Sequence, residues 1–165
     1  MTQDDLAAHA RAVIDANLYL VLGTVDEAGR PWTSPVYFAP AGDRVFHWMS
    51  ATESRHSRHV AERPEVSLVV FDSTVRPGHG RAVYGQGVAR VLADDEVDAA
   101  LETYPRRENG GGARVYSRDE VTAPSEFRMY VAALSSLWVL CPREPGRPCA
   151  LHGKAMDHRA EIPLG

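Results

Sequence analysis

The apolar residues of this chain fall mostly into short runs of strand length, separated by segments rich in Gly, Pro, Asp and Ser. Runs of this length that are rich in Val, Leu, Tyr and Trp are typical of β-strands. We expect five or six strands, drawn from the ranges 18–25, 31–38, 45–49, 66–71, 81–92 and 128–140. Residues 73–80 and 106–114 are expected to be loops, and residues 141–165 to be irregular apart from one short edge strand.

Three segments carry a helical pattern instead. Residues 4–16 repeat apolar side chains at helical spacing, and Asp94 is placed as the N-cap of a second helix that Pro105 ends. The third helix is expected to begin at Ser50, which opens an S-x-x-E capping box, and to end before Pro64. The pattern therefore predicts three short helices beside the strands.

The connections between the strands indicate how the sheet is built. Short turns join the first three strands, which we expect to form a meander. Pro31 and Pro35 cannot donate hydrogen bonds to a ladder, so part of the second strand should lie at a sheet edge. Gly85 and Gly87 inside the fifth strand indicate a bulge, a sharp bend or the close approach of another group. The pattern predicts one mainly β domain over residues 1–165, a β-barrel or strongly curved sheet with helical additions.

Composition and charge narrow the class of protein. The chain has 165 residues, 44% of them hydrophobic and 24% charged, which are the proportions of a soluble globular domain. A formal net charge of −4 gives no electrostatic reason to expect nucleic acid or an anionic membrane as partner. No apolar run approaches the roughly 20 residues of a membrane helix, and the acidic, amphipathic N-terminus is unlike a signal peptide. We therefore expect a cytoplasmic protein.

Two cysteines, Cys141 and Cys149, flank a Pro-rich stretch near the C-terminus. A cytoplasmic compartment would keep them reduced, so we expect free thiols rather than a disulfide. A zinc site would need more ligands at tighter spacing than these cysteines provide. His56 and His59 have the i, i+3 spacing of a shared metal site, but they lie among arginines and lack a third ligand nearby. We therefore expect no metal site.

The strongest candidate for ligand binding is the stretch 44–72. Hydroxyl groups and Arg55 gather around the helix start predicted at Ser50, and His56 follows directly. Free N–H groups of a helix N-terminus, its partial positive charge and a guanidinium together form a common type of phosphate site. A cation in the first turn is disfavoured unless an anion compensates for it. The sequence therefore predicts that this turn holds a phosphorylated cofactor.

Other motifs of catalysis are missing from the chain, which contains no G-x-S-x-G, H-E-x-x-H or P-loop pattern. The Gly-Gln-Gly triplet at 85–87 lies within a predicted strand and lacks the helix that a dinucleotide-binding loop requires. The three tryptophans lie on three different strands, and core packing is expected for at least one of them. Trp48 and Met49, at a strand end beside the predicted anion site, are placed to wall a flat ring system. The role of Trp138 stays open.

The segments GRPWTSPVYF, VFHWMS and ESRHSRHVAERPEVSLVVFD resemble the pyridoxamine 5′-phosphate oxidase-like superfamily of flavin-binding split barrels. The match covers about residues 18–92 and continues more weakly to residue 140; the stretch that starts at ESR is its most specific part. The resemblance implies a six-stranded split β-barrel, a homodimer, and FMN bound in clefts across the dimer interface. It also implies a small-molecule substrate.

The resemblance further implies which residues contact the cofactor. Residues 34–37 would lie along the isoalloxazine, Met49 and Ser50 would meet the ribityl-phosphate region, and Arg55 with His56 would meet the phosphate. Residues around Arg81 and Ala82 would reach in from the other subunit. The complete expected cofactor-binding set is Ser34, Pro35, Val36, Tyr37, Trp48, Met49, Ser50, Ser54, Arg55, His56, Arg81 and Ala82.

Departures from the family pattern leave three functions open. The true oxidases carry Lys where this chain has His56 and Gln where it has Ala82, and their C-terminal Trp…Arg substrate signature has no counterpart here. The first function is an FMN-dependent oxidoreductase of unassigned substrate, in which the flavin supplies the chemistry. The second is a reductase that uses the deazaflavin F420, whose anionic tail would favour extra basic residues such as Arg58 or Arg81. The third is a flavin-binding or storage protein without turnover.

Overall fold

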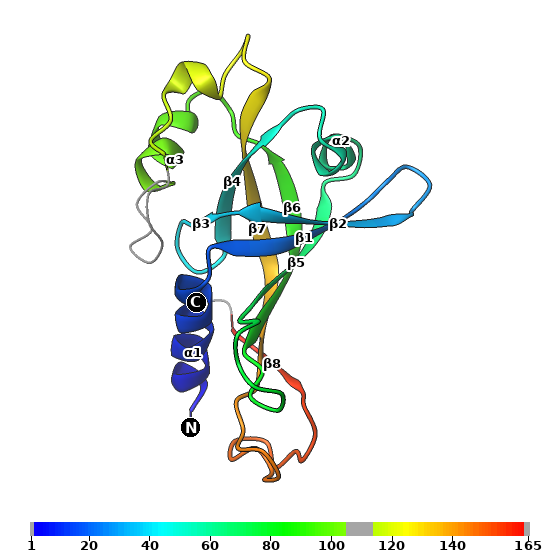
Figure 1. The fold of residues 1–165 in the computed structure, drawn as a ribbon, viewed down its shortest axis with the longest axis vertical. Helices are drawn as coiled ribbons and strands as arrows, with labels where there is room; N and C mark the ends of the chain where they lie inside the picture. The colour runs from blue at the N-terminus through cyan, green and yellow to red at the C-terminus, as the bar shows by residue number, and fades with distance from the viewer. Residues whose placement is uncertain (1, 105–113, 164–165) are drawn as a thin grey trace.

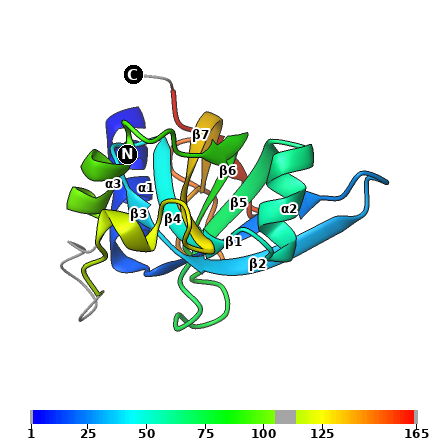
Figure 2. The same cartoon turned by 90° about the horizontal axis from the view of Figure 1, so that it is seen from above.

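A strongly curled antiparallel sheet forms the body of the protein in the computed structural model, which describes residues 2–104 and 114–163 (Figures 1 and 2). The sheet has eight strands in the order β2-β1-β5-β6-β7-β4-β3, and β8 pairs with β7 outside this path. The elements are α1 (Gln3–Ala16), β1 (Tyr19–Val25), β2 (Pro31–Tyr37), β3 (Ala39–Pro40), β4 (Val45–Ala51), α2 (Arg55–Glu62), β5 (Glu65–Phe71), β6 (Ala82–Val91), α3 (Val97–Thr103), a 3-10 turn (Arg118–Glu120), β7 (Phe127–Leu140) and β8 (Arg159–Glu161).

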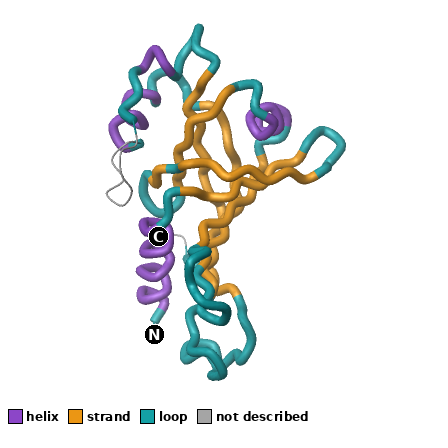
Figure 3. The backbone as a smooth tube through the Cα atoms, viewed as in Figure 1, coloured by secondary structure: helices purple, strands orange, loops and turns teal. Residues whose placement is uncertain are grey.

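The mainly β fold with short helices is confirmed, and its curled sheet agrees with the expected split barrel. The six long strands match the six predicted ranges closely, and β8, with three residues, is the short edge strand expected within residues 141–165. β3 is a short addition of two residues. Figure 3 shows the helices at the periphery of the strands. Pro105 and most of the loop predicted at 106–114 lie outside the described residues. Among the helices of the described ranges, none combines the length and the apolar composition needed to cross a bilayer.

The sheet closes on itself only in part. All of β2 pairs with β1, whereas the next residues, Ala39 and Pro40 of β3, pair with β4. The chain thus passes from one edge of the sheet to the other at Phe38, which is fully buried. Before that point, β2 and β4 are not paired with each other in the described residues, and we call this unpaired stretch the seam. The edge position predicted for the Pro-containing strand is confirmed.

The predicted meander is therefore only partly right. The first two strands form the expected hairpin, but β4 pairs along its length with β7, which follows it by many residues in the chain. Backbone pairing on this side of the third predicted strand is limited to the two residues of β3, which follow the second predicted strand. A sheet that must curl around one core brings its two ends together, and local hairpin signals in the sequence do not encode that closure.

The glycines of β6 mark a bulge, as predicted. The β6–β7 register shifts between Gln86 and Gly87, so that Ser135 has no partner opposite it. A Cβ atom on Gly87 would lie 2.1 Å from the carbonyl oxygen of Ala133, so only glycine fits there. A bulge bends the strand and increases its twist, which helps the sheet to curl.

Helix α3 begins at Val97 with Glu96 as its N-cap, not at Asp94 as predicted. The Glu96 carboxylate accepts hydrogen bonds from the Ala93 backbone N–H at 2.7 Å and from the Arg90 guanidinium at 2.6 Å and 2.7 Å. These bonds close a turn ahead of the helix, so Asp94 stays in that turn and caps nothing.

Two apolar clusters hold the elements together. The larger one fills the inside of the curled sheet and includes the fully buried Leu6, Leu22, Phe46 and Trp48. The smaller one packs α3 against the β4–β7 side of the sheet; it contains Ala39, Leu92, Val97, Ala100, Tyr104, Val121, Met129 and Val131. Together the two clusters hold the ends of β2 and β4 in place, and these two strands border the seam.

Candidate functional site

Helix α2 begins at Arg55 with Ser54 as N-cap, four residues after the start predicted at Ser50. Ser50 and Ala51 still pair with Arg128 and Phe127 of β7, so strand β4 continues through the predicted cap. The capping-box prediction is therefore wrong, because cross-strand pairing prevailed over the local signal. The side chain of Ser54 makes no capping hydrogen bond, so it leaves the first N–H groups of α2 unbonded by a cap.

His56 lies across the seam and connects its two sides. Its Nδ1 atom lies 3.2 Å from Oγ of Ser34 on β2, and its Nε2 atom lies 2.8 Å from Oγ of Ser50 on β4. Nε2 also lies 3.1 Å from Oγ of Ser54. We call these four residues the seam cluster. Ser34 and Ser50 are each only 9% exposed, so the cluster is largely shielded from water.

An aromatic ring and a guanidinium border the seam cluster. The Trp32 indole Nε1–H donates to Oγ of Ser34 at 3.0 Å, and the Arg55 guanidinium lies 4.4 Å from the centre of the Trp32 ring. Such a cation–π contact orients Arg55 without neutralising its charge. No carboxylate takes part in the described contacts of the cluster; Glu53 lies near Arg58 instead, at 3.8 Å. The cluster therefore offers hydroxyl, imidazole and guanidinium groups to an anion.

The charge state of His56 follows from its burial. Desolvation lowers the pKa of His56, and the nearby His59 lowers this pKa further. The imidazole is therefore mainly neutral near pH 7, and its one N–H faces either Ser34 from Nδ1 or Ser50 and Ser54 from Nε2. A bound phosphate would favour the protonated ring, because an opposite charge at hydrogen-bond distance raises the pKa of an imidazole.

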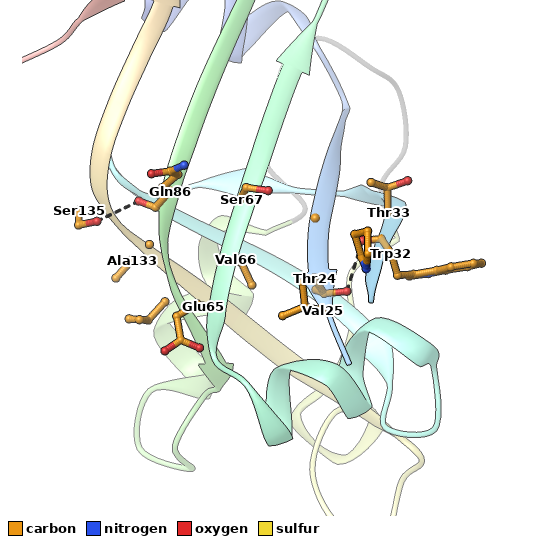
Figure 4. Close-up of a pocket in the computed structure, with 14 residues that line it drawn as sticks. Thr24, Val25, Trp32, Thr33, Glu65, Val66, Ser67, Gln86, Ala133 and Ser135 are labelled. Atoms are coloured by element: carbon orange, nitrogen blue, oxygen red, sulfur yellow. Dashed lines mark hydrogen bonds between the residues drawn. The ribbon is translucent and has the colours of Figure 1, made fainter. Parts of the chain in front are cut away.

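A groove lies on the outer face of the sheet beside the seam (Figure 4). Its volume is about 600 Å³, and a second groove of about 570 Å³ continues it. Cofactor-sized ligands occupy pockets of roughly 300–1,000 Å³. Both grooves are lined by Gly23, Thr33, Ser67 and Gln86, and Figure 4 shows Trp32 at the β2 margin of the first. Small side chains thus leave a shallow, extended surface next to the phosphate-type site.

The predicted cofactor contacts on β2 and β4 have different surroundings. Trp48 was expected to wall a flat ring, but it is fully buried and stacks on Tyr130 at 5.5 Å. This expectation is wrong because Trp48 points into the main core, where it has no surface for a ligand. Val36 is also in that core and Pro35 is exposed, whereas Tyr37 and Met49 are half-buried against the smaller cluster.

Arg81 and Ala82 lie away from α2, at the opposite end of β6 (Figure 1). Arg81 borders a small pocket of about 190 Å³ that also contains Cys141. Ala82 is buried and pairs with Phe71. The expected approach of these residues to a flavin in a neighbouring subunit concerns a partner chain and stays a prediction.

Sequence reasoning missed two residues beside the seam cluster. It also considered, and did not favour, a metal site shared by His56 and His59. Trp32 was left without a role, and Ser57 was overlooked although it accepts a hydrogen bond from Ser54 at 2.8 Å. Placing the N-cap at Ser54 would have marked Ser57 as a first-turn neighbour. His59 does not share a site with His56: its Nδ1 atom lies 3.0 Å from the Thr24 hydroxyl, in the buried interior.

Comparison with known proteins adds the following relationships. The family model described as "Pyridoxamine 5′-phosphate oxidase" matches residues 6–140. A pyridoxine/pyridoxamine 5′-phosphate oxidase of Bacteroides fragilis is 31% identical over 154 residues, which make up 92% of this chain and 62% of that protein. The chain thus spans less than two thirds of the length of this curated relative.

Solved structures share the fold at low sequence identity. A heme-binding protein from Mycobacterium smegmatis is similar with a TM-score of 0.68 and 18% identity, covering 95% of this chain and 58% of that one. An F420 reductase is similar with a TM-score of 0.57 and 20% identity, covering 77% of this chain and 94% of that one. At these identities the likeness establishes the fold alone, and the ligands of these two proteins differ.

Proposed function

Because the chain belongs to the pyridoxamine 5′-phosphate oxidase family, we propose that it is an FMN-dependent oxidoreductase whose cofactor phosphate binds at the seam cluster. The observation that carries this proposal is His56 joining Ser34 and Ser50 across the seam at the start of α2. Hydroxyls, an imidazole, Arg55 and uncapped helix N–H groups converge there with no carboxylate among the described contacts. This is the donor set that a phosphate requires.

Each group has a distinct part in this proposal. Arg55 supplies the permanent charge, and Trp32 keeps its guanidinium in place. Once His56 carries a proton on Nε2, this atom no longer accepts from the Ser50 hydroxyl, which can then donate to the phosphate. Ser54 already donates to Ser57 and keeps its oxygen toward His56. When bound, the flavin supplies the redox chemistry, and the protein supplies orientation and electrostatics. We do not propose pyridoxamine 5′-phosphate as the substrate, because the residue after Arg55 is His and the C-terminal substrate signature of the oxidases has no counterpart.

A homodimer in the cytoplasm is part of the proposal. The outer face of the sheet is open, with small residues such as Gly23 and Ser67 in its centre and exposed Phe71 and Val88 beside them. A second copy on this face would cover the groove and bring its own Arg81 region toward the flavin. Cys141 and Cys149 are not joined by a disulfide, which suits a reducing compartment.

Titration of the apo protein with FMN, F420 and hemin tests the choice of cofactor. FMN is expected to bind most tightly and to give a flavin absorbance spectrum with a protein-induced shift. F420 is the second candidate, supported by the similar F420 reductase fold and by the exposed Arg58 one turn from Arg55. Tighter binding of F420 or hemin than of FMN would overturn the proposal.

A reductase assay separates an enzyme from a flavin-binding protein without turnover. NADH or NADPH is mixed with the FMN-loaded protein, and flavin reduction is followed by loss of absorbance against free FMN at the same concentration. We expect the protein to accelerate reduction by at least one of these donors. Equal rates with and without protein would favour the storage function instead.

A further inference from the structure

Four potential metal ligands converge at the end of the molecule opposite α2. They are Cys141, Cys149, His152 and His158, and one ligand atom from each lies within 4.8 Å of all the others. Figure 1 shows this segment as the loop beyond β7, at the far end of the long axis from α2. From the sequence alone only the two cysteines of this group were considered as ligands, and no metal site was expected.

Strand pairing places two of the four ligands opposite each other. β7 and β8 are antiparallel, with Leu140 opposite Arg159. One step further along this ladder, the Cys141 backbone N–H donates to the His158 carbonyl at 2.9 Å. The sheet register therefore fixes Cys141 and His158 side by side, although they are far apart in the sequence.

A tight turn supplies the other two ligands. The Cys149 N–H donates to the Lys154 carbonyl, and the Gly153 N–H donates to the Cys149 carbonyl, both at 2.8 Å. Gly153 has a φ of 65°, which glycine adopts without strain. The turn folds His152 back over Cys149, whose Sγ accepts the His152 backbone N–H at 3.4 Å. Hydrogen bonds of this kind stabilise a thiolate.

Three of the distances between the ligand atoms lie close to those of a tetrahedral zinc site. Zn–S bonds of about 2.3 Å and Zn–N bonds of about 2.0–2.1 Å at tetrahedral angles separate S from N by roughly 3.6 Å and N from N by roughly 3.3 Å. His152 Nδ1 lies 3.5 Å from each of the two Sγ atoms and 3.1 Å from His158 Nε2. The two Sγ atoms are 3.1 Å apart, closer than the roughly 3.8 Å of a zinc site and well beyond a disulfide bond of about 2.05 Å.

The second ring nitrogen of His158 has a partner that orients the ring. His158 Nδ1 lies 3.1 Å from the Met156 carbonyl oxygen, to which it can only donate. This fixes the tautomer in which Nε2 carries the lone pair and faces the other ligands. Arg143 and Asp157 form an ion pair at 2.7 Å across the base of the same loop. Both the ring and the loop are thus held in the position that a metal would need.

We propose that Cys141, Cys149, His152 and His158 form a structural zinc site that fastens the C-terminal segment to the end of β7. Two cysteines and two histidines are a ligand set of structural zinc, and two thiolates neutralise the charge of the ion. All four positions are filled by protein, so the site leaves no open position for catalysis. This proposal replaces the sequence-based expectation of no metal site and is independent of the proposed flavin function.

Zinc content of the 165-residue chain, purified under reducing conditions, tests the proposal. Inductively coupled plasma mass spectrometry is expected to find about one zinc per chain. Replacing zinc with cobalt should give the visible absorption of a tetrahedral site together with a thiolate charge-transfer band. Little or no zinc after reconstitution with equimolar zinc chloride, or a cobalt spectrum without thiolate bands, would overturn the proposal.

The buried cysteines also contribute to packing, so replacing them could unfold the protein. The matched variants therefore change the histidine ligands instead. The double variant His152→Gln and His158→Gln should lose zinc, whereas His79→Gln, in an exposed loop residue outside the group, should retain it. Zinc should also protect both thiols of the wild type from alkylation, and a chelator should remove that protection. A disulfide found by mass spectrometry in the freshly reduced and purified protein, or equal zinc content in all variants, would contradict the site.

Discussion

The seam cluster and the Cys/His group lie at opposite ends of one curled sheet, and both contain histidine beside small polar side chains. Around His56 the partners are three hydroxyls, with Arg55 close by. These groups can donate hydrogen bonds and positive charge, so the site is suited to bind an anion. Around His152 the partners are two sulfurs and a second imidazole, which can converge on a cation. The difference teaches that the neighbours of a histidine, and not the histidine itself, decide the sign of the ligand.

The largest expected effect concerns the charge beside the seam cluster. Replacing Arg55 with Ala should weaken FMN binding roughly 10–150-fold, because a hydrogen bond to a charged group contributes about 1.5–3 kcal/mol. Arg58 on the same helix is the control: it is exposed and lies near Glu53 at 3.8 Å. Its replacement by Ala should change the affinity by no more than about twofold, since exposed ion pairs contribute little. Fluorescence titration with FMN measures both, and equal losses would show that the phosphate lies elsewhere.

The two regions also differ in how far the sequence could predict them. Arg55 and His56 follow the predicted helix start at Ser50 by five and six residues, so a phosphate site was expected near them even though the cap was placed at Ser50 and not Ser54. The role of Ser34 in bridging to His56 depends on the curl of the sheet, which no local pattern encodes. Here the sequence brought Arg55 and His56 together as candidate phosphate contacts and missed the geometry that joins His56 to Ser34.

The Cys/His group could not be predicted in this way. Cys141 and His158 meet only because β7 and β8 pair, and β8 has three residues, too few to give a periodic signal. The prediction that Trp48 contacts a flat ring was wrong for a related reason. Its position at a strand end next to an anion site suggested such a contact, but the face of the strand on which a side chain lies decides whether it points to solvent or to the core. The strands themselves were found well, since their apolar runs are local.

The pH dependence of FMN binding distinguishes the permanent charge of Arg55 from the titratable charge of His56. Burial lowers the pKa of His56 and a bound phosphate would raise it, so FMN binding favours the protonated ring. FMN affinity should therefore rise as the pH falls from about 8 to about 6.5. His56→Gln should flatten this dependence relative to wild type, and His56→Lys should bind FMN about fivefold more tightly at pH 8, given the stronger charged hydrogen bond. The second ionisation of the FMN phosphate is common to all three proteins and cancels in the comparison.

Identical pH profiles for the wild type and His56→Gln would place the imidazole outside the phosphate contacts. An increase in affinity for His56→Lys at high pH, together with a lost slope for His56→Gln, would identify His56 as the group that takes up the proton. The measurement is a set of FMN dissociation constants at constant ionic strength.

A smaller effect is expected on the stability of the apo protein. The pKa values of His9, His47 and His56 are all lowered, with burial as the first cause. The unfolded chain therefore binds more protons than the folded one as the pH falls below about 6.5, so the free energy of unfolding should decrease from there toward pH 5. The pKa of Glu96 is lowered to about 2 by hydrogen bonds from Arg90, so this carboxylate contributes only at more acidic pH.

Urea unfolding at pH 7.5, 6.5 and 5.5, with a chelator present to exclude metal release, measures this dependence. His56→Gln should reduce the acid-induced loss, and saturating FMN should reduce it further in the wild type, where the anion favours the charged ring. If the free energy of unfolding of His56→Gln falls with decreasing pH as steeply as that of the wild type, His9 and His47 account for the whole loss of stability.

The smallest expected effect links the two ends of the molecule. Within one chain, β7 separates them by on the order of 40 Å, and sites that far apart with no shared partner act independently. Arg81, however, borders the pocket that contains Cys141, and the proposed dimer brings the Arg81 region of one subunit to the flavin of the other. Loss of zinc in the His152→Gln, His158→Gln variant should therefore weaken FMN binding only about two- to threefold. The expected cause is that Arg81 becomes less well ordered when the neighbouring loop loses its metal.

A double-mutant cycle with Arg81→Ala decides whether this link exists. If Arg81 carries the coupling, the histidine substitutions should have no further effect on FMN affinity once Arg81 is Ala, and the dimer should persist in all four proteins by analytical ultracentrifugation. The same loss in both backgrounds would mean that the zinc end acts through the sheet and not through the neighbouring subunit. The cycle thereby tests whether the two ends of the sheet, separate within a chain, form one functional unit across the dimer.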